Sequence, residues 1–243
     1  MPKRGRPLSS PPSTPRPQNR LLACLPDADF KQLRPHLRTV SVKAKHVFHR
    51  QDEPIREVYF LNGGVASMTM AMKDGSMVEI ATIGKEGFVG VGAYLGASVA
   101  AEAMMQVPGG DAEALPVEVF KTQLAKGRAF ADCVQRYSQG LLRLMMQSTA
   151  CMARHNVQDR CCRWLLMTHD RVHSDHFHLS QEFLAMMLGA TRPTVTVVAR
   201  SLQKAGIIEY THGRITILDR PALEAGACEC YASVKEHFDR LGL

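Results

Sequence analysis

The strongest constraint on the fold of this chain is a run of residues that begins at Gln181 and has the spacing of a helix-turn-helix. Its apolar residues fall where two crossed helices form a small core, and a small residue stands where the second helix crosses the first. The turn between the helices favours glycine because it needs a positive φ. The residues that match these requirements are Leu184, Ala185, Leu188, Gly189, Ala190, Val195 and Val198.

The residues around this run predict where its helices begin and end. Ser180 and Thr191 are suitable N-cap residues, and Gly206 ends the second helix, which we expect from Arg192 to about Ala205. The β-prone segments on either side of His212-Gly213 predict a hairpin, the wing of a winged helix. A plain helical hairpin is the alternative interpretation.

A helix of this kind binds DNA by placing its N-terminal residues against base edges in the major groove. Arg192 could bind a guanine with two hydrogen bonds, and the threonines could contact phosphates or thymine methyl groups. Arginine and lysine further along are expected at phosphates, although a solvated surface charge is the alternative for Lys204. The predicted DNA-binding residues are Ser180, Gln181, Thr191, Arg192, Thr194, Thr196, Arg200, Lys204 and Arg214.

The segment from about Thr39 to Phe120 has the pattern of short strands. Residues 58–61, 65–72 and 77–83 are strand candidates, and Asn62-Gly63-Gly64 and Asp74-Gly75 are turn signals between them. Short strands at close spacing with glycine turns predict an all-β sandwich or barrel.

A long helix is predicted next, over residues 129–158. Its apolar positions recur with a heptad spacing, and its length corresponds to roughly 40 Å. A narrow apolar stripe on so long a helix favours packing against the same helix of a second copy, and packing against the chain's own barrel is the alternative. The predicted dimer-interface residues are Val134, Tyr137, Leu141, Leu144, Ser148 and Cys151, with His155 at the end of the stripe.

Residues 1–20 form a basic, proline-rich segment. They hold six of the 13 prolines and carry Lys3, Arg4, Arg6, Arg16 and Arg20 without any acidic residue, which accounts for five of the formal net +7 charges. We expect a disordered tail that binds polyanions. Its start, Pro2-Lys3-Arg4-Gly5-Arg6-Pro7, is similar to the core of a minor-groove-binding AT-hook, with a nonspecific basic tail as the alternative.

Composition limits the class of protein. Of 243 residues, 45% are hydrophobic, which is enough for a substantial core, yet no apolar run reaches the ~18 residues that a membrane span needs. The N-terminus does not read as a secretory signal, and the seven cysteines lack a disulfide-scaffold spacing. We therefore expect a cytoplasmic protein that does not enter a membrane.

From Leu21 onward the chain resembles the Crp/Fnr family of bacterial transcription regulators. The resemblance is strongest at 179–189, 191–195 and 202–208, and Asn62-Gly63-Gly64 and 84–87 are similar to landmarks of the family's barrel. It implies an α+β fold with a cyclic-nucleotide-binding-like β-barrel (a double-stranded β-helix or jelly roll), a long dimerisation helix and a C-terminal winged helix-turn-helix. After the expected disordered tail, 1–20, the barrel corresponds to 21–128, the dimerisation helix to 129–158 and the winged helix-turn-helix to 159–243. It also implies a homodimer on a two-fold-symmetric operator, with RNA polymerase as a further partner.

Two departures from the family pattern affect what the chain recognises. In the second helix, Arg192 matches the familiar arginine, but Pro193 and Val197 replace a glutamate and a second arginine, so the operator need not be the familiar one. Between Leu95 and Val107 no arginine or lysine could hold a phosphate, and Glu102 would repel one. We therefore expect no cyclic AMP binding, with Lys85 as the one alternative source of charge, and no cofactor.

Other readings have less support. No nucleophile–base pair, P-loop or dinucleotide motif appears, so the sequence predicts no enzyme. A metal at His169, His173, His176 and His178 and a redox role for the cysteines are weaker than a solvated loop and idle thiols, so no metal site is predicted. The alternative function is a ligand- or protein-binding barrel without DNA binding.

Overall fold

The computed structural model describes residues 16–243, so the proposed AT-hook core and the rest of residues 1–15 lie outside the described part. The described chain begins with three short helices, α1 (Arg20–Ala23), α2 (Asp27–Leu33) and the 3-10 helix η1 (Arg34–His36). Residues 16–20, which were expected to be disordered, belong to the described part and contact the folded chain. Asn19 is fully buried, because its side-chain amide donates to the carbonyl oxygens of Leu61 at 2.9 Å and Gly87 at 2.7 Å.

Eight antiparallel strands follow and form two four-stranded sheets, which we call the β-sandwich. This arrangement is jelly-roll-like, as predicted, and no strand pairing joins the two sheets among the described residues. One sheet has the order β1 (Arg38–Ser41), β8 (Asp111–Pro116), β3 (Glu57–Leu61), β6 (Phe88–Val89). The other has the order β2 (Val47–His49), β7 (Glu102–Val107), β4 (Val65–Ala71), β5 (Met77–Ile83).

The predicted turns of the sandwich are confirmed. Gly75 connects β4 and β5 with φ of +82°, and Gly64 precedes β4 with φ of +77°. A Cβ at Gly64 would meet the carbonyl oxygen of Val107 at 2.3 Å, so this turn requires glycine for both reasons. The strands β7 and β8, which the sequence pattern did not single out, complete the two sheets.

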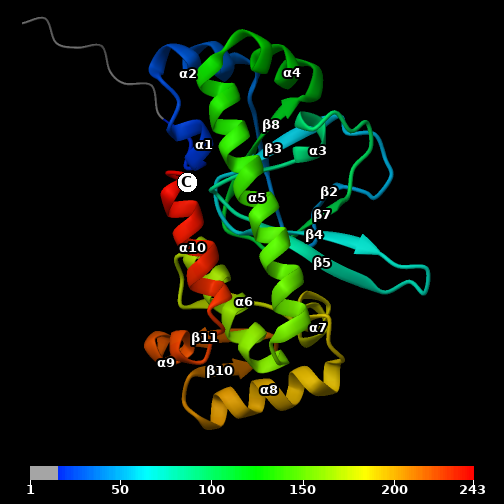
Figure 1. Ribbon diagram of the computed structural model, residues 1–243, viewed down its shortest axis with the longest axis vertical. Helices are drawn as coiled ribbons and strands as arrows, with labels where there is room; N and C mark the ends of the chain where they lie inside the picture. The colour runs from blue at the N-terminus through cyan, green and yellow to red at the C-terminus, as the bar shows by residue number, and fades with distance from the viewer. Residues whose placement is uncertain (1–15) are drawn as a thin grey trace, which may run out of the picture.

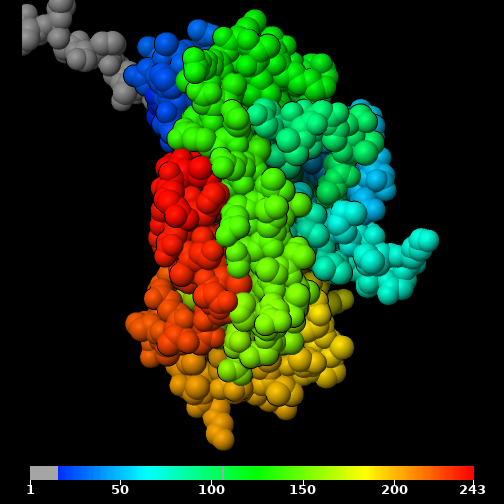
Figure 2. Space-filling model, viewed as in Figure 1, coloured from blue at the N-terminus to red at the C-terminus, as the bar shows by residue number. Residues whose placement is uncertain are grey.

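The helix α5 (Arg128–Arg154) runs along the whole molecule beside the β-sandwich, after the shorter helices α3 (Val91–Tyr94) and α4 (Val117–Lys126) (Figure 1). Its inner side lies in the largest hydrophobic core together with residues of both sheets. The C-terminal helix α10 (Cys230–Arg240) packs beside it, where a Cβ at Gly140 would lie 3.1 Å from the Phe238 ring. Figure 2 shows α5 exposed between α10 and the β-sandwich.

The predicted dimer seam of α5 faces the protomer's own core, which corrects its assignment to a dimer interface. Val134, Tyr137, Leu141, Leu144 and Cys151 are each at most 2% exposed within the single chain. Ser148 is half-buried and accepts a hydrogen bond from Arg163 at 3.0 Å, and His155 lies beyond the helix end. The exposed stripe of α5 is shifted by about one residue from the predicted dimer seam and has the same heptad spacing. This outer stripe comprises Gln135, Gln139, Leu142, Met146, Thr149 and Ala153.

The remaining elements form the C-terminal unit below the β-sandwich in Figure 1. They are α6 (Val157–Val172), β9 (His176–His178), α7 (Gln181–Leu188), α8 (Arg192–Lys204), β10 (Ile208–Thr211), β11 (Arg214–Ile217) and α9 (Arg220–Ala225). A second hydrophobic core, centred on α6, α7 and α8, holds this unit together. Among the described residues, no helix combines the length and apolar character that crossing a membrane requires.

Two buried carboxylates join the C-terminal unit to the β-sandwich. Glu86, in the turn before β6, accepts hydrogen bonds from Arg171 of α6 at 2.6 and 2.9 Å. Burial opposes its ionisation, but the charge and hydrogen bonds of Arg171 outweigh this and lower the pKa of Glu86. Glu79 of β5 accepts a hydrogen bond from the Trp164 indole at 2.9 Å and another from Ser67. Burial raises the pKa of Glu79 to about 7.

The raised pKa of Glu79 predicts a pH-dependent stability. The folded protein holds this proton more tightly than the unfolded chain, so the free energy of unfolding should decrease as pH rises from about 4.5 to about 7. The Glu79→Gln variant should lose this component, and the exposed Glu118→Gln variant should retain it. Denaturant unfolding at several pH values checks this, and equal pH dependence in wild type and Glu79→Gln would contradict it.

Candidate DNA-binding site and sensor cavity

The helix-turn-helix has the caps and turn that the sequence predicts. Ser180 Oγ accepts a hydrogen bond from the Phe183 amide at 3.2 Å, and Thr191 Oγ1 accepts one from the Thr194 amide at 3.4 Å. Gly189, with φ of +53°, ends α7 and makes the turn into α8. Because both helices begin and end at defined residues, the direction in which α8 leaves the turn is fixed.

The small core between α7 and α8 determines which side of α8 faces outward. The predicted core positions are buried, with Val195 fully enclosed and Val198 8% exposed, while Ala190 is half-buried. Since these residues point toward α7 and α6, the opposite side of α8 must face solvent. The helix lies at the end of the molecule farthest from α2 and α4, so nothing in the described chain covers that side (Figure 1).

The outward side of α8 is basic and partly apolar. Arg192, Thr194, Arg200 and Lys204 are exposed, as predicted for DNA-contacting residues, and α8 has no acidic side chain. Val197 is 66% exposed in the middle of this side. The sequence already singled out Val197 as a replacement for a familiar arginine, and the structure shows that its side chain is exposed.

Thr196 has a different place from the one expected. It is half-buried, and its hydroxyl oxygen lies 2.9 Å from Oε1 of Gln181 and 3.0 Å from the carbonyl oxygen of Arg192. This side chain therefore connects the start of α7 to α8 and is not free to meet a base. Its predicted role in DNA binding becomes one of positioning α8 against α7.

The N-terminal ends of both helices meet the turn of the wing. Ser180, Gln181 and Arg192 line a shallow depression together with residues from β10 and the turn after it. The other lining residues, Tyr210, His212 and Gly213, were not predicted; Tyr210 is held by a 2.7 Å hydrogen bond to the Leu179 carbonyl oxygen. Arg214 is exposed at the start of β11, as predicted.

The wing contains one strand more than the sequence reading gave it. The loop that carries several histidines includes β9, which pairs with β11 and extends the hairpin to a three-stranded sheet. The exposed–buried–exposed alternation of His176, Phe177 and His178 could have indicated this strand. His176 and His178 are exposed on it, and His169 binds Asp175 at 2.8 Å, so these histidines do not assemble into a metal site.

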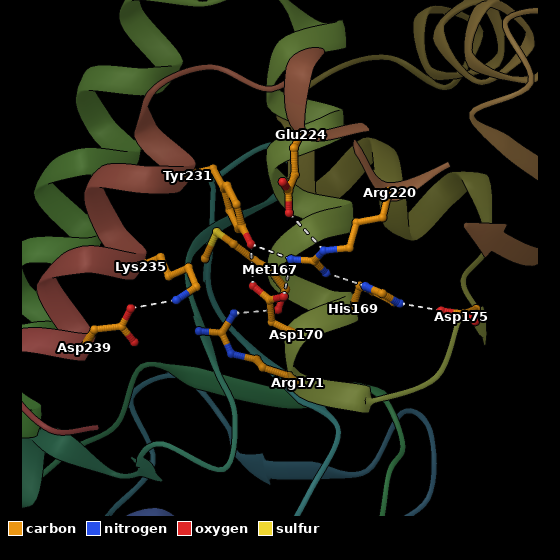
Figure 3. A network of polar contacts seen from close by, with 10 residues as sticks. All are labelled: Met167, His169, Asp170, Arg171, Asp175, Arg220, Glu224, Tyr231, Lys235 and Asp239. Carbon is orange, nitrogen blue, oxygen red and sulfur yellow. Dashed lines mark hydrogen bonds and ion pairs between the residues drawn. The ribbon is translucent and has the colours of Figure 1, made fainter. Parts of the chain in front are cut away.

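A polar network behind α8 holds the C-terminal unit in shape. Figure 3 shows Arg220 of α9 donating to Asp170 of α6 and Glu224 of α9, with Tyr231 of α10 beside them. The Arg220–Asp170 and Arg220–Tyr231 contacts are both 2.8 Å, and Tyr231 donates to Asp170 at 2.9 Å. Each of the three helices thus contributes to one connected set of hydrogen bonds, which fixes their relative placement.

A large cavity lies between the β-sandwich and α5. Its volume is about 540 Å³, large enough for a small organic ligand. Its wall includes Ile55 and Tyr94 from the sandwich side and Leu141, Leu142 and Met145 from α5. None of the described residues that line it is Arg, Lys, Asp or Glu. His49 also lines it, but burial lowers the pKa of His49, so its imidazole is neutral at pH 7 and the cavity offers no cation for a phosphate.

The two charged residues considered earlier lie outside this cavity wall. Lys85 contacts His173 and lines a separate depression beside α6 and α10, so it does not supply the missing positive charge. Glu102, at the start of β7, is also absent from the lining, so the predicted repulsion by Glu102 does not operate within the cavity itself. The apolar lining is what disfavours a phosphate here.

Comparison with known protein families identifies the kind of domain that the C-terminal unit contains. Residues 159–225 match the Crp-like helix-turn-helix domain. This chain carries a Crp-like DNA-binding domain. The match begins inside α6 and ends with α9, so the Crp-like domain includes the wing and both partners of the Arg220–Asp170 pair, while Tyr231 of α10 lies beyond it. A search of curated protein sequences gave no significant match.

Solved structures, regulators among them, share the fold of about four fifths of this chain. A CRP-family regulator from Thermus thermophilus has a TM-score of 0.65 and 21% identity, covering 78% of this chain and 96% of its own. FixK2 from Bradyrhizobium japonicum gives 0.63 and 16%, covering 79% and 98%. The c-di-GMP responsive regulator CLP from Xanthomonas campestris gives 0.66 and 16%, covering 80% and 100%. The Crp-like domain thus belongs to a chain with the Crp/Fnr fold.

The apolar cavity predicts that cyclic nucleotides do not bind. Moving a phosphate into a cavity without a cationic side chain costs its hydration and returns no ion pair. Isothermal titration calorimetry with cyclic AMP and cyclic GMP should therefore give no heat of binding at micromolar concentrations. Saturable micromolar binding that disappears on introducing Leu142→Glu into the cavity wall would contradict this prediction.

Proposed function

We propose that this chain is a cytoplasmic transcription regulator that binds a two-fold-symmetric DNA operator as a homodimer. The observation that carries the proposal is the exposed basic side of α8 within a Crp-like domain. A helix held by its two caps, with its wing beside it, matches the shape of the major groove. The proposal assigns the chain a binding role and no catalytic one.

Base reading is assigned to the N-terminal half of α8. Arg192 is exposed in the first turn and lies beside the wing, where it can reach a guanine edge. Val197 is exposed one turn later and suits a thymine methyl group. Arg200 and Lys204, toward the C-terminal end, suit phosphates, which position the helix without reading sequence.

Dimerisation is assigned to the outer stripe of α5. Leu142 is 56% exposed and Met146 58% exposed. Together with Gln139 and Thr149 they follow the alternating three- and four-residue spacing of a heptad stripe. Two such stripes pack against each other in a left-handed coiled coil. The arrangement would bring two copies of α8 to one side of the dimer, with half-sites about one helical turn apart.

An effector in the apolar cavity would act through the same helix. Leu142 belongs both to the cavity wall and to the outer stripe of α5. A ligand that repositions Leu142 or Met145 therefore changes the dimer contact directly, and the two α8 helices follow as the dimer rearranges. The lining favours an uncharged, apolar effector.

The dimer assignment predicts the effect of charge on the outer stripe. The Leu142→Glu/Met146→Glu double variant should be monomeric in analytical ultracentrifugation and should lose most of its operator affinity, because facing carboxylates repel and one half-site binds weakly. Leu218→Glu is the matched control, since Leu218 is also 58% exposed but lies in the C-terminal unit. A double variant that stays dimeric would contradict the assignment.

The DNA-binding assignment predicts two different effects of substitution. Arg192→Ala should cost about 1–3 kcal/mol on the preferred operator and relax specificity at one base position. Lys204→Ala should weaken binding similarly on all sequences and reduce the salt slope by about 1. Selection from random DNA followed by titrations at several salt concentrations checks both.

Lys235→Ala is the control for these titrations, because Lys235 pairs with Asp239 on α10, away from α8 (Figure 3). Its affinity and salt slope should equal those of the wild type. If the wild type itself shows no binding to any duplex at low ionic strength, the proposed function is wrong.

A further inference from the structure

A cluster of three cysteines and one histidine lies where α5 ends and α10 begins. Cys151 belongs to the last turn of α5 and His155 follows that helix, while Cys228 and Cys230 flank the start of α10. Their ligand atoms all lie within 4.8 Å of one another. The two pairs are about 75 residues apart in sequence, so only the fold brings them together.

Two distances within the cluster match the edges of a tetrahedral metal site, and all the others are at most 4.8 Å. The Sγ atoms of Cys151 and Cys228 are 3.5 Å apart, and Sγ of Cys230 lies 3.6 Å from Nδ1 of His155. Zinc bonds of about 2.3 Å to sulfur and about 2.0 Å to nitrogen place tetrahedral ligands roughly 3.5–3.8 Å apart. A single ion at the centre could therefore reach all four atoms with small adjustments of the side chains.

The neighbours of the cluster provide the contacts that metal ligands need. His155 directs Nδ1 toward the cysteines, while its Nε2 lies 3.1 Å from a carboxylate oxygen of Glu229. A carboxylate that accepts from the second ring nitrogen orients a ligating histidine and increases its basicity. The Gln147 amide donates to Sγ of Cys230 at 3.0 Å, which suits a sulfur carrying negative charge.

Burial separates this cluster from bulk water and from both large hydrophobic cores. Cys151 is fully buried, Cys230 is 1% exposed and Cys228 8% exposed, and the three form a small cluster of their own. Cys228 and Cys230 also lie at the N-terminal end of α10. Four protein ligands leave no open position, which is the arrangement of a structural site.

We propose that Cys151, His155, Cys228 and Cys230 bind one zinc ion. Soft thiolates with one imidazole in a tetrahedral set favour zinc over hard cations such as magnesium or calcium. On binding, the thiol protons pass to solvent and the sulfurs coordinate as thiolates. The ion would connect the end of α5 to α10 across the link between α5 and α6. It would thereby fix the orientation of the C-terminal unit relative to the long helix.

Metal content tests the proposal directly. The full-length protein is purified under reducing conditions and dialysed exhaustively. It should then retain about one zinc per chain, measured by inductively coupled plasma mass spectrometry. Cys151→Ser and Cys228→Ser should each lose it, whereas Cys24→Ser, which changes a cysteine remote from the cluster, should retain it. His155→Cys keeps four ligands and should also retain zinc, while His155→Gln should not.

A second measurement uses the unaltered chain, so it does not depend on how the variants fold. Replacing zinc by cobalt should give the intense visible bands of tetrahedral cobalt together with a sulfur-to-cobalt charge-transfer band. Removing the ion with a chelator should lower the melting temperature of the wild type. These readouts require no DNA binding, so they stand apart from the test of the proposed function.

Three results would overturn the zinc site. The first is reduced wild-type protein that takes up neither zinc nor cobalt. The second is a Cys151→Ser/Cys228→Ser double variant that folds and still retains its metal. The third is a cobalt spectrum of six-coordinate, oxygen-ligated type.

Discussion

The burial of one side of α5 is the interaction on which the rest of the structure depends. Tyr137 is 1% exposed and lies so close to the turn before β6 that a Cβ at Gly87 would come within 1.9 Å of its ring. The same helix touches both sheets and α10 within one continuous core. Since burying a large apolar side chain contributes about 1.5–3 kcal/mol, several such residues on one helix account for its fixed place.

Polar contacts then fix the C-terminal unit against this helix and the sandwich. The Glu86–Arg171 pair and the Glu79–Trp164 hydrogen bond both cross from the β-sandwich to α6. Losing one partner of a buried pair leaves an uncompensated charge, which costs about 3–5 kcal/mol, so the two units separate only with difficulty. The proposed zinc ion would add a third connection at the other end of α6. Under the proposed function, a signal that reorients α8 would act through these contacts or through the proposed dimer contact.

The helix-turn-helix could be predicted almost completely because its requirements are local. N-caps, a glycine turn and the spacing of Leu184, Leu188, Val195 and Val198 depend on residues close together in sequence, and each is confirmed. Much of the sandwich was predictable for the same reason, since β3, β4 and β5 are joined by glycine turns. Strands β7, β8 and β9 were missed because they are short and their partners lie far away in the sequence.

The sequence by itself determined that α5 has a heptad apolar stripe, that α8 is the capped second helix of a helix-turn-helix, and that no arginine or lysine lies between Leu95 and Val107. Only the tertiary structure decided which side of α5 is free, because periodicity specifies an apolar face but not what covers it. The tertiary structure also decided that Thr196 contacts Gln181 of α7. It likewise brought together the cluster of Cys151, His155, Cys228 and Cys230. Packing sets the distances between residues that are far apart in sequence, and local sequence spacing does not predict those distances.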